Sequence, residues 1–429
     1  MGDFINVNPS TPLSEYCRNA SNKEGDTFVG IKSEFVDGQH SLSIHFPIGF
    51  EISQNEEIVR DEIISLISVL QLYNDQQSRI SKIMPEQVLK TVRFPVQAYF
   101  TVLVDYLNND YYQIKEEQYK QGISGPINWA RTIKMEMPIP QKNGLIYTKY
   151  RVKHHNETDR DLITEINKYC VYQSYLRLGW IYKLPLPPEP HRRREINVYQ
   201  NYLECALLRA NRDKDKQLFS AMIDILNFEN NANDLTQFYF GTNRFEYIWE
   251  KLIQETYGNV KKEDYFPKTK WRLKIGSESD NTALEPDTVM RESSDIFILD
   301  AKYYKYGITL NPKDLPNSSS INKQITYGEH VVTKKVFDSK NVYNAFLMPF
   351  DSKKQPYNVE KGHYYSIGEG VSSWKESDEN YQRVQGILVD IKFLIKNSIK
   401  PNNNEIVKLS NAIKESLKEC AKRDQLRKT

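Results

Sequence analysis

The segment IFILDAKY (296–303) is apolar on both faces until two charged residues interrupt it. Its β-branched and aromatic residues predict a strand, and side chains alternate between the two faces of a strand. Ile296, Ile298, Asp300 and Lys302 therefore share one face. A strand that is apolar on both faces is usually covered on both sides, where an unpaired charge is costly to bury. The rest of the chain must therefore supply partners for Asp300 and Lys302.

The patterns around this strand predict an α/β fold. Apolar residues at helical spacing predict helices over 57–73, 157–182, 196–228 (one or two helices), 243–258, 318–337 (with a serine cap) and 406–429. Alternation and β-branched residues predict strands over 40–50, 125–140, 288–291, 296–303, 341–350 and 362–368. This order predicts a central mixed β-sheet flanked by helices, with a separate N-terminal mixed α/β region.

Composition shifts along the 429 residues predict four parts. They are a polar tail (1–25), an N-terminal recognition or partner-docking region (26–185), a proline- and arginine-rich linker with a helical connector (186–235), and a C-terminal domain (236–429) with a basic last helix. The main boundary is expected near residue 190, because KLPLPPEPHRRRE (183–195) holds four prolines and three consecutive arginines.

Several classes of function are disfavoured. The formal charge of +2 means that any polyanion contact must come from local basic patches. The four cysteines form no CxxC pair, so reduced thiols and no zinc module are expected. No apolar run of membrane-spanning length and no signal peptide is present, which predicts a cytoplasmic protein without membrane contact. GxxxxGK[ST] is absent, so hydrolysis of ATP or GTP through a P-loop is not expected.

Two carboxylates can compensate the charged strand end if they share a metal ion. Asp287 belongs to the single Pro-Asp pair of the chain, and it approaches Asp300 if 288–291 and 296–303 pair as a hairpin. With the Ala301 carbonyl they would hold one or two Mg²⁺ ions, which prefer oxygen ligands and can activate water for phosphodiester cleavage. Lys302 would orient that water or offset developing charge. The alternative is an ordinary surface ion pair.

The Asp-x-Lys triplet alone is not specific, because it occurs four times. Two DSK copies, at 338–340 and 351–353, lie in polar turns, where solvated charge pairs are expected. The DIK copy at 390–392 follows an apolar run, as the DAK copy at 300–302 does, but no Pro-Asp precedes it.

The helix over 243–258 offers two further carboxylates, Glu246 and Glu250, one turn apart. Helical periodicity places Glu246 closer to the apolar stripe and therefore mildly favours it. The alternative is that both are solvated, as helix glutamates usually are. From the residues alone the choice stays open.

The order Glu, Pro-Asp, Asp-x-Lys resembles that of the PD-(D/E)XK nuclease superfamily. More closely, the chain resembles LlaJI-type restriction endonucleases, relatives of the McrC nuclease subunits. The similarity spans about residues 40 to 350, through FPIGF (46–50), INWARTI (127–133), ITEINKYCVYQS (163–174), YIWEKLIQETYGN (247–259), EPD (285–287) and ILDAKYY (298–304).

This resemblance implies an Mg²⁺-dependent endonuclease that restricts foreign double-stranded DNA, with Asp287, Asp300, Lys302 and Glu250 in its active site. The spacing of Trp-Glu to Gly258 matches the family and favours Glu250 over Glu246. Gln324 and Tyr327 resemble a Gln-x-x-Tyr helix found near the metal site of related nucleases, although an exposed helix glutamine is an equal alternative. The resemblance also implies an McrB-like GTPase partner and a cognate DNA methyltransferase.

Two other functions are compatible with the sequence. A repair or recombination nuclease of the same superfamily would share the site but cut by DNA structure. A non-catalytic DNA-binding subunit would keep the fold, but it would have no reason to keep the four charged residues together. The sequence does not indicate the oligomeric state.

Overall fold

The computed structural model divides the chain into two compact units, which we call the middle unit (Met1–Ile5 and Lys90–Phe238) and the outer unit (Asn6–Leu89 and Tyr239–Thr429). The structure describes residues 11–21, 23, 26–36, 39–77, 92–113, 116–123, 125–142, 144–156, 162–182, 185–190, 195–231, 238–276, 279–281, 283–335, 337–354, 356–357, 362–374, 379–397 and 402–428.

This division differs from the boundary predicted near residue 190. The predicted region 26–185 is split, because the strands before residue 50 pair with a strand after residue 237. The predicted connector 186–235 contains two helices that pack within the middle unit. Composition indicates linker segments. Pairing between strands that are about two hundred residues apart in the sequence leaves no local signal. Residues 191–194 and most of the predicted tail lie outside the described residues.

A small sheet opens the outer unit. Its strands run in the order β1-β3-β2-β9: β1 (Cys17–Asn19), β3 (Gln39–Phe46), β2 (Val29–Val36) and β9 (Phe238–Thr242). Gly30 and Gly241 lie opposite each other where β2 and β9 pair. A side chain on Gly30 would come within 2.2 Å of the Phe240 carbonyl oxygen, so glycine is required for this approach. The long helix α1 (Glu56–Gln77) follows.

The second sheet of the outer unit is mixed, as predicted. Its order is β12-β13-β14-β16-β15: β12 (Thr288–Glu292), β13 (Asp295–Ala301), β14 (Val342–Phe350), β16 (Val384–Asp390) and β15 (Tyr364–Gly370). The three central strands are parallel, and both edge strands are antiparallel to their neighbours. Buried strands of this kind read as continuous apolar runs, which is why 296–301 shows no alternation.

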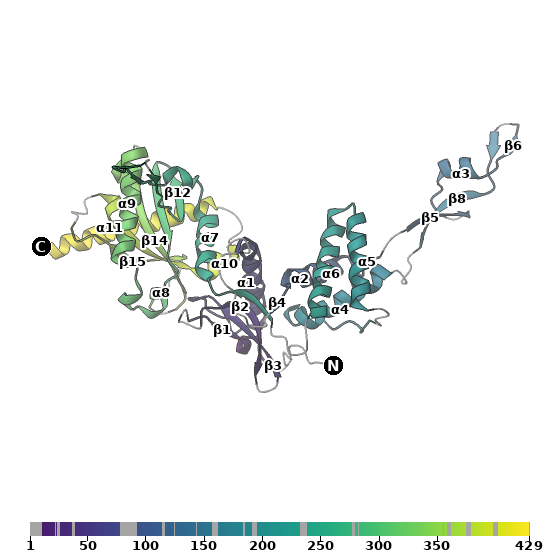
Figure 1. Ribbon diagram of the computed structural model, residues 1–429, viewed down its shortest axis with the longest axis horizontal. Helices are drawn as coiled ribbons and strands as arrows, with labels where there is room; N and C mark the ends of the chain where they lie inside the picture. The colour runs from purple at the N-terminus through teal and green to yellow at the C-terminus, as the bar shows by residue number, and fades with distance from the viewer. Residues whose placement is uncertain are drawn as a thin grey trace. The chain divides into compact units, whose positions relative to one another are not determined.

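Helices cover both faces of this sheet (Figure 1). Helix α9 (Ser318–Lys335) lies over Ile296 and Ile298 and shares one apolar core with them. Helices α7 (Phe245–Tyr257) and α11 (Asn403–Lys428) cover the opposite face, where the Lys414 ammonium lies 5.5 Å from the centre of the Phe297 ring. The fold of this unit is therefore α/β, and the charged end of β13 emerges between two helical layers.

One buried hydrogen bond joins the two ends of the outer unit. The Ile48 N–H, in the segment FPIGF, donates to the Tyr303 hydroxyl at 2.8 Å. The Tyr303 ring packs against Phe245 at 5.3 Å between ring centres. This contact holds the chain just beyond β13 against the small sheet.

The middle unit is built on helices α2 (Val96–Asn109), α4 (Leu162–Tyr182), α5 (Ile196–Arg209) and α6 (Asp213–Asn231). Its buried ion pair joins Arg177 and Glu229 at 3.1 Å, and the Tyr99 hydroxyl donates to the same carboxylate at 2.6 Å. Arg177 is only 2% exposed, so these partners compensate a charge that would otherwise be costly to bury.

Strands β5 (Glu116–Gly122) and β8 (Tyr150–Asn156) lead from these helices into a small lobe, which we call the arm (residues 116–156). The arm also contains α3 (Trp129–Met135), β6 (Ile139–Gln141) and β7 (Gly144–Ile146). The strand predicted over 125–140 is therefore wrong. Asn128 caps α3 by accepting the Arg131 N–H, and this local bond favours the helix over a strand.

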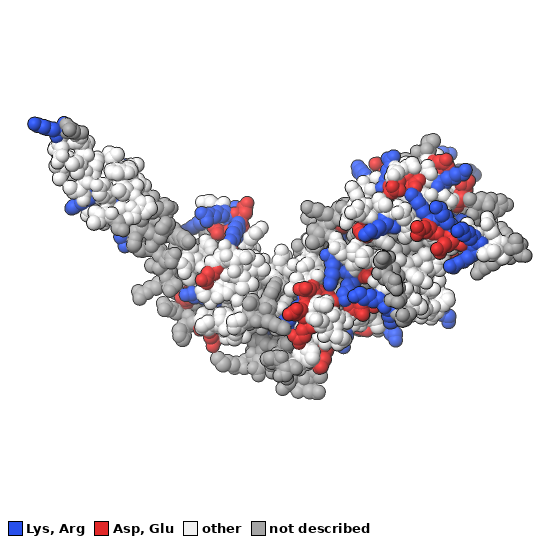
Figure 2. Space-filling view, turned by 180° about the vertical axis from the view of Figure 1, so that it is seen from behind, with Lys and Arg blue, Asp and Glu red and all other residues white. Residues whose placement is uncertain are grey.

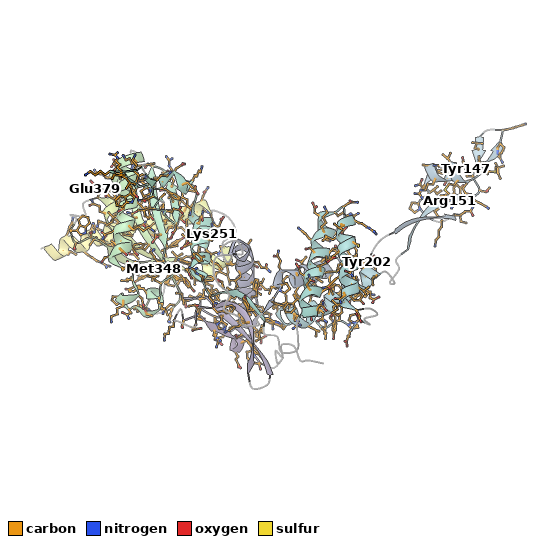
Figure 3. All side chains as sticks on the ribbon, viewed as in Figure 1. Tyr147, Arg151, Tyr202, Lys251, Met348 and Glu379 are labelled. Atoms are coloured by element: carbon orange, nitrogen blue, oxygen red, sulfur yellow. The ribbon has the colours of Figure 1, made fainter. Side chains whose placement is uncertain are left out.

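The arm exposes several large apolar side chains among its polar ones. Its described surface on the face shown in Figure 2 carries few charged residues, whereas Lys, Arg, Asp and Glu intermingle over the outer unit. Trp129, Ile133 and Met137 are 52%, 61% and 93% exposed. Arg151 (labelled in Figure 3) bonds Glu136 at 2.7 Å and ties the two sides of the arm together.

One of two local details, the cap of α9, differs from the sequence-based expectation. Helix α9 is capped by Asn317, whose side chain accepts the Ser320 N–H, rather than by a serine. Gly258 ends α7 with an ordinary φ of −69°, so it is not left-handed. A side chain there would come within 2.6 Å of the Gln254 carbonyl oxygen, and that proximity explains the glycine. Within the described part of the chain, no helix is long and apolar enough to cross a membrane.

We predict that Tyr303→Phe destabilises the outer unit by about 1–3 kcal/mol, because the buried Ile48 N–H loses its acceptor. The matched control is Tyr304→Phe, since Tyr304 is 36% exposed and should change stability by less than about 0.5 kcal/mol. Thermal unfolding followed by circular dichroism measures both. Equal unfolding midpoints for the two variants would contradict the proposed role of this bond.

Candidate active site

The β12–β13 hairpin brings Asp287 to Asp300. Thr288 pairs with Leu299 in the antiparallel register, so the next pair outward is Asp287 with Asp300. The Asp287 carboxylate accepts the backbone N–H of Ala301 at 2.8 Å. The hairpin predicted from the sequence is thus present, and its register sets two acidic residues side by side.

Lys302 compensates Asp300. Its ammonium lies 2.5 Å from the Asp300 carboxylate, whose side chain is only 7% exposed. Burial lowers the pKa of Lys302, but the Asp300 carboxylate, with smaller contributions from Asp287 and Tyr304, raises it, and the net shift is upward. The Lys302 ammonium also lies 5.9 Å from the centre of the Phe346 ring. The buried charge of Asp300 at the end of β13 is therefore compensated in part by an ion pair with Lys302, which follows the strand directly.

The two glutamates of α7 differ in their surroundings. Glu246 is 43% exposed and pairs with Arg244 at 3.1 Å. Glu250 is half-buried, and Asp300 and Lys302 both act on it electrostatically. The neighbouring Trp249 donates its indole N–H to the Leu347 carbonyl, which also accepts the Lys302 N–H. These two bonds fix α7 beside the end of β13, and Glu250 lies near enough to Asp300 and Lys302 for their charges to act on it.

The cluster is short of positive charge. Burial raises the pKa of Asp287 to about 8, and the carboxylates of Asp300 and Glu250 add to this effect, while the Ala301 N–H and Lys302 oppose it. Burial also raises the pKa of Glu250, as does Asp300, against the opposing effects of Lys302 and Lys262. Lys302 and Lys262 together therefore do not offset the effects of burial and of the neighbouring carboxylates on these pKa values.

Gln324 and Tyr327, predicted as accessory residues, support the site from α9. Gln324 is buried, not exposed, and its amide donates to the Ile298 carbonyl at 2.7 Å, two residues before Asp300. Tyr327 donates to the Glu285 carbonyl at 2.8 Å, two residues before Asp287. The pKa of the Tyr327 hydroxyl is raised by burial and by the nearby Asp300 and Asp287. Both residues hold the backbone that carries the carboxylates.

Lys262 is a residue at the site that the sequence did not single out. It lies in a short 3-10 helix (Lys262–Tyr265), and its ammonium donates to the Asp287 backbone carbonyl at 3.1 Å. The only signal in the sequence is a lysine pair between the glutamate helix and the Pro-Asp turn. Such pairs are usually solvated, so pattern alone could not identify it.

The competing DIK triplet has a structural explanation. The Asp390 carboxylate bonds the Ser352 hydroxyl, and Lys392 pairs at 2.6 Å with Glu62, which is fully buried. These residues tie the helix α10 (Ile391–Asn397) to α1. The triplet therefore stabilises the packing of α10 against α1, and it makes no contact with the Asp287–Asp300 pair among the described interactions.

The residues of the cluster suit a hard divalent cation in their chemistry. No three His, Cys, Asp or Glu side chains already form a metal-holding group in the described ranges. The donor set of Asp287, Asp300 and Glu250 is nevertheless all oxygen, as Mg²⁺ prefers, and the raised pKa of Asp287 indicates a deficit of positive charge. The Ala301 carbonyl remains a predicted further ligand.

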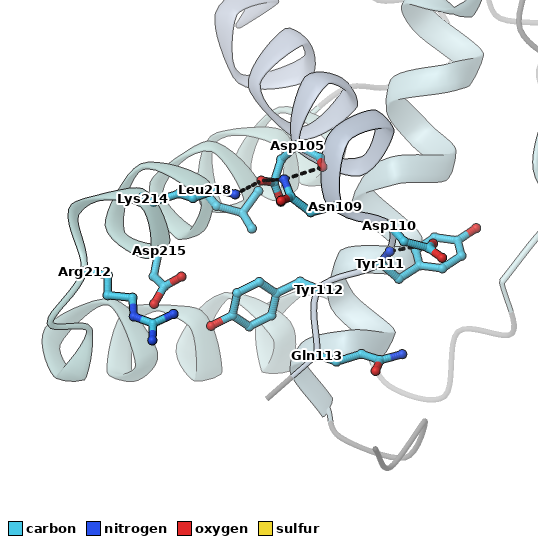
Figure 4. Close-up of a pocket in the computed structure, with 10 residues that line it drawn as sticks. All are labelled: Asp105, Asn109, Asp110, Tyr111, Tyr112, Gln113, Arg212, Lys214, Asp215 and Leu218. Atoms are coloured by element: carbon cyan, nitrogen blue, oxygen red, sulfur yellow. Dashed lines mark hydrogen bonds and ion pairs between the residues drawn. The ribbon is translucent and has the colours of Figure 1, made fainter. Parts of the chain in front are cut away.

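A polar pocket of about 480 Å³ lies in the middle unit, between the end of α2 and the start of α6 (Figure 4). Its charges largely satisfy each other: Lys214 pairs with Asp105 at 3.0 Å, and Asn109 donates to the same carboxylate at 2.9 Å. This pocket has no counterpart to the uncompensated carboxylates of the outer unit.

We predict that the metal-free protein becomes less stable as the pH rises from about 5 to 8. Unfolded Asp287 releases its proton near pH 3.8, whereas the folded protein keeps it until about pH 8. In this window folding takes up a proton, so the free energy of unfolding falls as pH rises. Asp287→Asn should flatten the dependence and raise stability at pH 8.

Stability is measured by thermal unfolding in the presence of a chelator. The transition to follow is that of the outer unit, which is the transition that Tyr303→Phe shifts. Asp264→Asn, which changes an exposed carboxylate, serves as the control and should keep the wild-type slope. An Asp287→Asn variant with the wild-type slope would show that the cluster does not hold the proton.

Comparison with known proteins identifies the family of the chain. No curated protein sequence matches the chain. Among solved structures, a chain of the Thermococcus gammatolerans assembly of McrB AAA+ hexamers with bound McrC is similar, with 14% identity, a TM-score of 0.34, and coverage of 87% of this chain and 81% of that chain. The family model of the LlaJI restriction endonuclease matches residues 28–365, which is most of the chain. The chain therefore belongs to the LlaJI restriction endonuclease family.

Proposed function

We propose that the outer unit is an Mg²⁺-dependent nuclease of the PD-(D/E)XK superfamily that cuts foreign double-stranded DNA. Family membership supports a nuclease role in restriction. The observation that carries the finer proposal is the convergence of Asp287, Asp300, Glu250 and Lys302 from a helix and a hairpin. Structural packing alone does not require three carboxylates at one buried point.

Each residue has a distinct role in this proposal. Asp287, Asp300 and Glu250 would hold Mg²⁺, which when bound polarises the phosphoryl oxygen and makes hydroxide available near neutral pH. Lys302, released in part from Asp300, would orient the attacking water and offset the negative charge that develops on the phosphate. Tyr327 and Gln324 would keep the two acidic segments in register through their bonds to the backbone.

The partners of this nuclease remain part of the proposal. The protein would work beside a DNA methyltransferase that marks host DNA, and with an McrB-like GTPase subunit. The exposed Trp129, Ile133 and Met137 of the arm support a protein partner, because exposed apolar side chains commonly mark interaction sites. The middle unit would then dock the partner or read DNA, as proposed for the N-terminal region from the sequence.

We predict that Asp300→Asn and Lys302→Met each slow plasmid cleavage by roughly 100-fold or more, because each removes a group needed at the phosphate. Cleavage by the wild type should require Mg²⁺ and stop with a chelator. The assay uses unmethylated plasmid, with and without an McrB-like GTPase subunit, and with GTP.

The matched controls are Asp338→Asn and Lys340→Met, which make the same changes in another Asp-x-Lys triplet. That triplet lies in the short helix Ser339–Asn341, which leads into β14 at the end of the sheet opposite Asp300. The controls should cut at the wild-type rate. If Asp300→Asn and Lys302→Met also cut at that rate, the catalytic assignment is wrong.

We also predict that methylation of the recognition site blocks cleavage, since restriction must spare host DNA. Matched plasmids, methylated or not, test this directly. Equal cutting of both, with a preference for branched or nicked DNA, would favour a repair nuclease with the same site.

A further inference from the structure

A segment between the glutamate helix and the Pro-Asp turn alternates cations with mostly apolar residues. The sequence KTKWRLKIG (268–276), which we call the basic segment, has Lys268, Lys270, Arg272 and Lys274 at every second position. In an extended chain such residues share one face, spaced by roughly 6.5 Å. Neither the catalytic cluster nor the core of the unit uses these residues.

The basic segment is one side of a two-stranded ribbon. Strand β10 (Lys270–Trp271) pairs antiparallel with β11 (Ser279–Asp280). The ribbon is closed at its base by two backbone bonds, Leu284 N–H to the Pro267 carbonyl at 3.0 Å and Asn281 N–H to the Thr269 carbonyl at 2.9 Å. Its base therefore has a defined structure next to the Pro-Asp turn.

Both sides of the basic segment face solvent. Every residue from 268 to 276 is exposed, including Trp271 at 62% and Ile275 at 91%. Lys268, Arg272 and Lys274 have no ion-pair or hydrogen-bond partner for their side chains among the residues that the structure describes. A ribbon with this much exposed apolar and cationic surface is suited to a partner.

The ribbon starts and ends beside the carboxylate cluster. Leu284 precedes Asp287 by three residues. On the near side, Lys262 bonds the Asp287 carbonyl, and Lys261 and Lys262 line a cavity of about 230 Å³ together with Thr288. Lys262 and Lys261 thus place positive charge beside the cluster, in a cavity that Glu255 and Glu263 also line.

We propose that the basic segment binds the backbone of double-stranded DNA next to the phosphodiester that is cut; this inference rests on the proposed nuclease function. Three carboxylates at the site repel a polyanion, so cations must hold the DNA close by. A two-stranded ribbon fits the major groove of a duplex, and Lys or Arg contacts to phosphates position a protein on it. A protein partner fits less well, because the cations alternate along the whole segment rather than rimming an apolar centre.

The test uses the full chain carrying Lys268→Gln, Arg272→Gln and Lys274→Gln together. Lys270 is left intact because it lies in the paired strand. Binding to a fluorescent duplex is followed by anisotropy, without Mg²⁺, over a series of salt concentrations. The control is a triple variant at exposed lysines, Lys334→Gln, Lys340→Gln and Lys418→Gln, which removes the same charge elsewhere.

We expect the basic-segment variant to bind duplex at least about tenfold more weakly near physiological salt, with a salt dependence shallower by about three in log–log slope. The control should match the wild type in both. The inference would be overturned if the basic-segment variant had the affinity and slope of the control, or if the wild type did not bind duplex. It would also be overturned if the variant bound duplex normally and lost only the binding of a protein partner.

This test is separate from that of the proposed function, because binding is measured without catalysis. Asp300→Asn should bind the duplex at least as tightly as the wild type, because it removes one repelling carboxylate, whether or not it cuts. All three changed side chains are exposed, so unfolding midpoints should be unchanged and a loss of binding is not a loss of fold.

Discussion

The site depends on the pairing of Asp287 with the backbone of Ala301. This bond, made by the Asp287 side chain, holds two carboxyl groups side by side at a buried strand end. Repulsion between buried carboxylates opposes folding, so the surrounding structure must hold them. Two hydrogen bonds hold the backbone around Asp287: one from Tyr327 of α9 to the Glu285 carbonyl and one from Lys262 of the 3-10 helix to the Asp287 carbonyl. The helices that cover the sheet bury the backbone of β13.

The same constraint explains why distant segments meet here. Helix α7 must lie against β14 to present Glu250, and the Leu347 carbonyl accepts both the Trp249 indole and the Lys302 N–H. The segment FPIGF, nearly two hundred residues earlier than α7, anchors Tyr303 just after Lys302. An outer unit made of two stretches of chain thereby supports one short charged strand, while the middle unit is inserted between them.

Part of this structure is readable from the sequence because its causes are local. The hairpin, α7, α9 and the four charged residues follow from periodicity, from the single Pro-Asp pair and from family resemblance. The helix over Trp129–Met135 was missed because an asparagine cap outweighs a strand-like composition. Periodicity favoured Glu246, whereas in the structure the charge of Asp300 acts on the half-buried Glu250, and Glu246 pairs with Arg244 at the surface. The discontinuous unit, the structural DIK triplet and Lys262 depend on long-range contacts that leave no mark in a short window.

The most direct test of the central claim is calorimetric titration of Mg²⁺ into the wild type and Asp287→Asn at pH 7, in two buffers of different ionisation enthalpy. If the carboxylate cluster is the metal site, Mg²⁺ binds the wild type saturably and displaces the proton that Asp287 holds below about pH 8. Asp287→Asn should lose this proton release and most of the affinity. Equal binding and equal proton release in both proteins, or no binding by the wild type, would contradict the account.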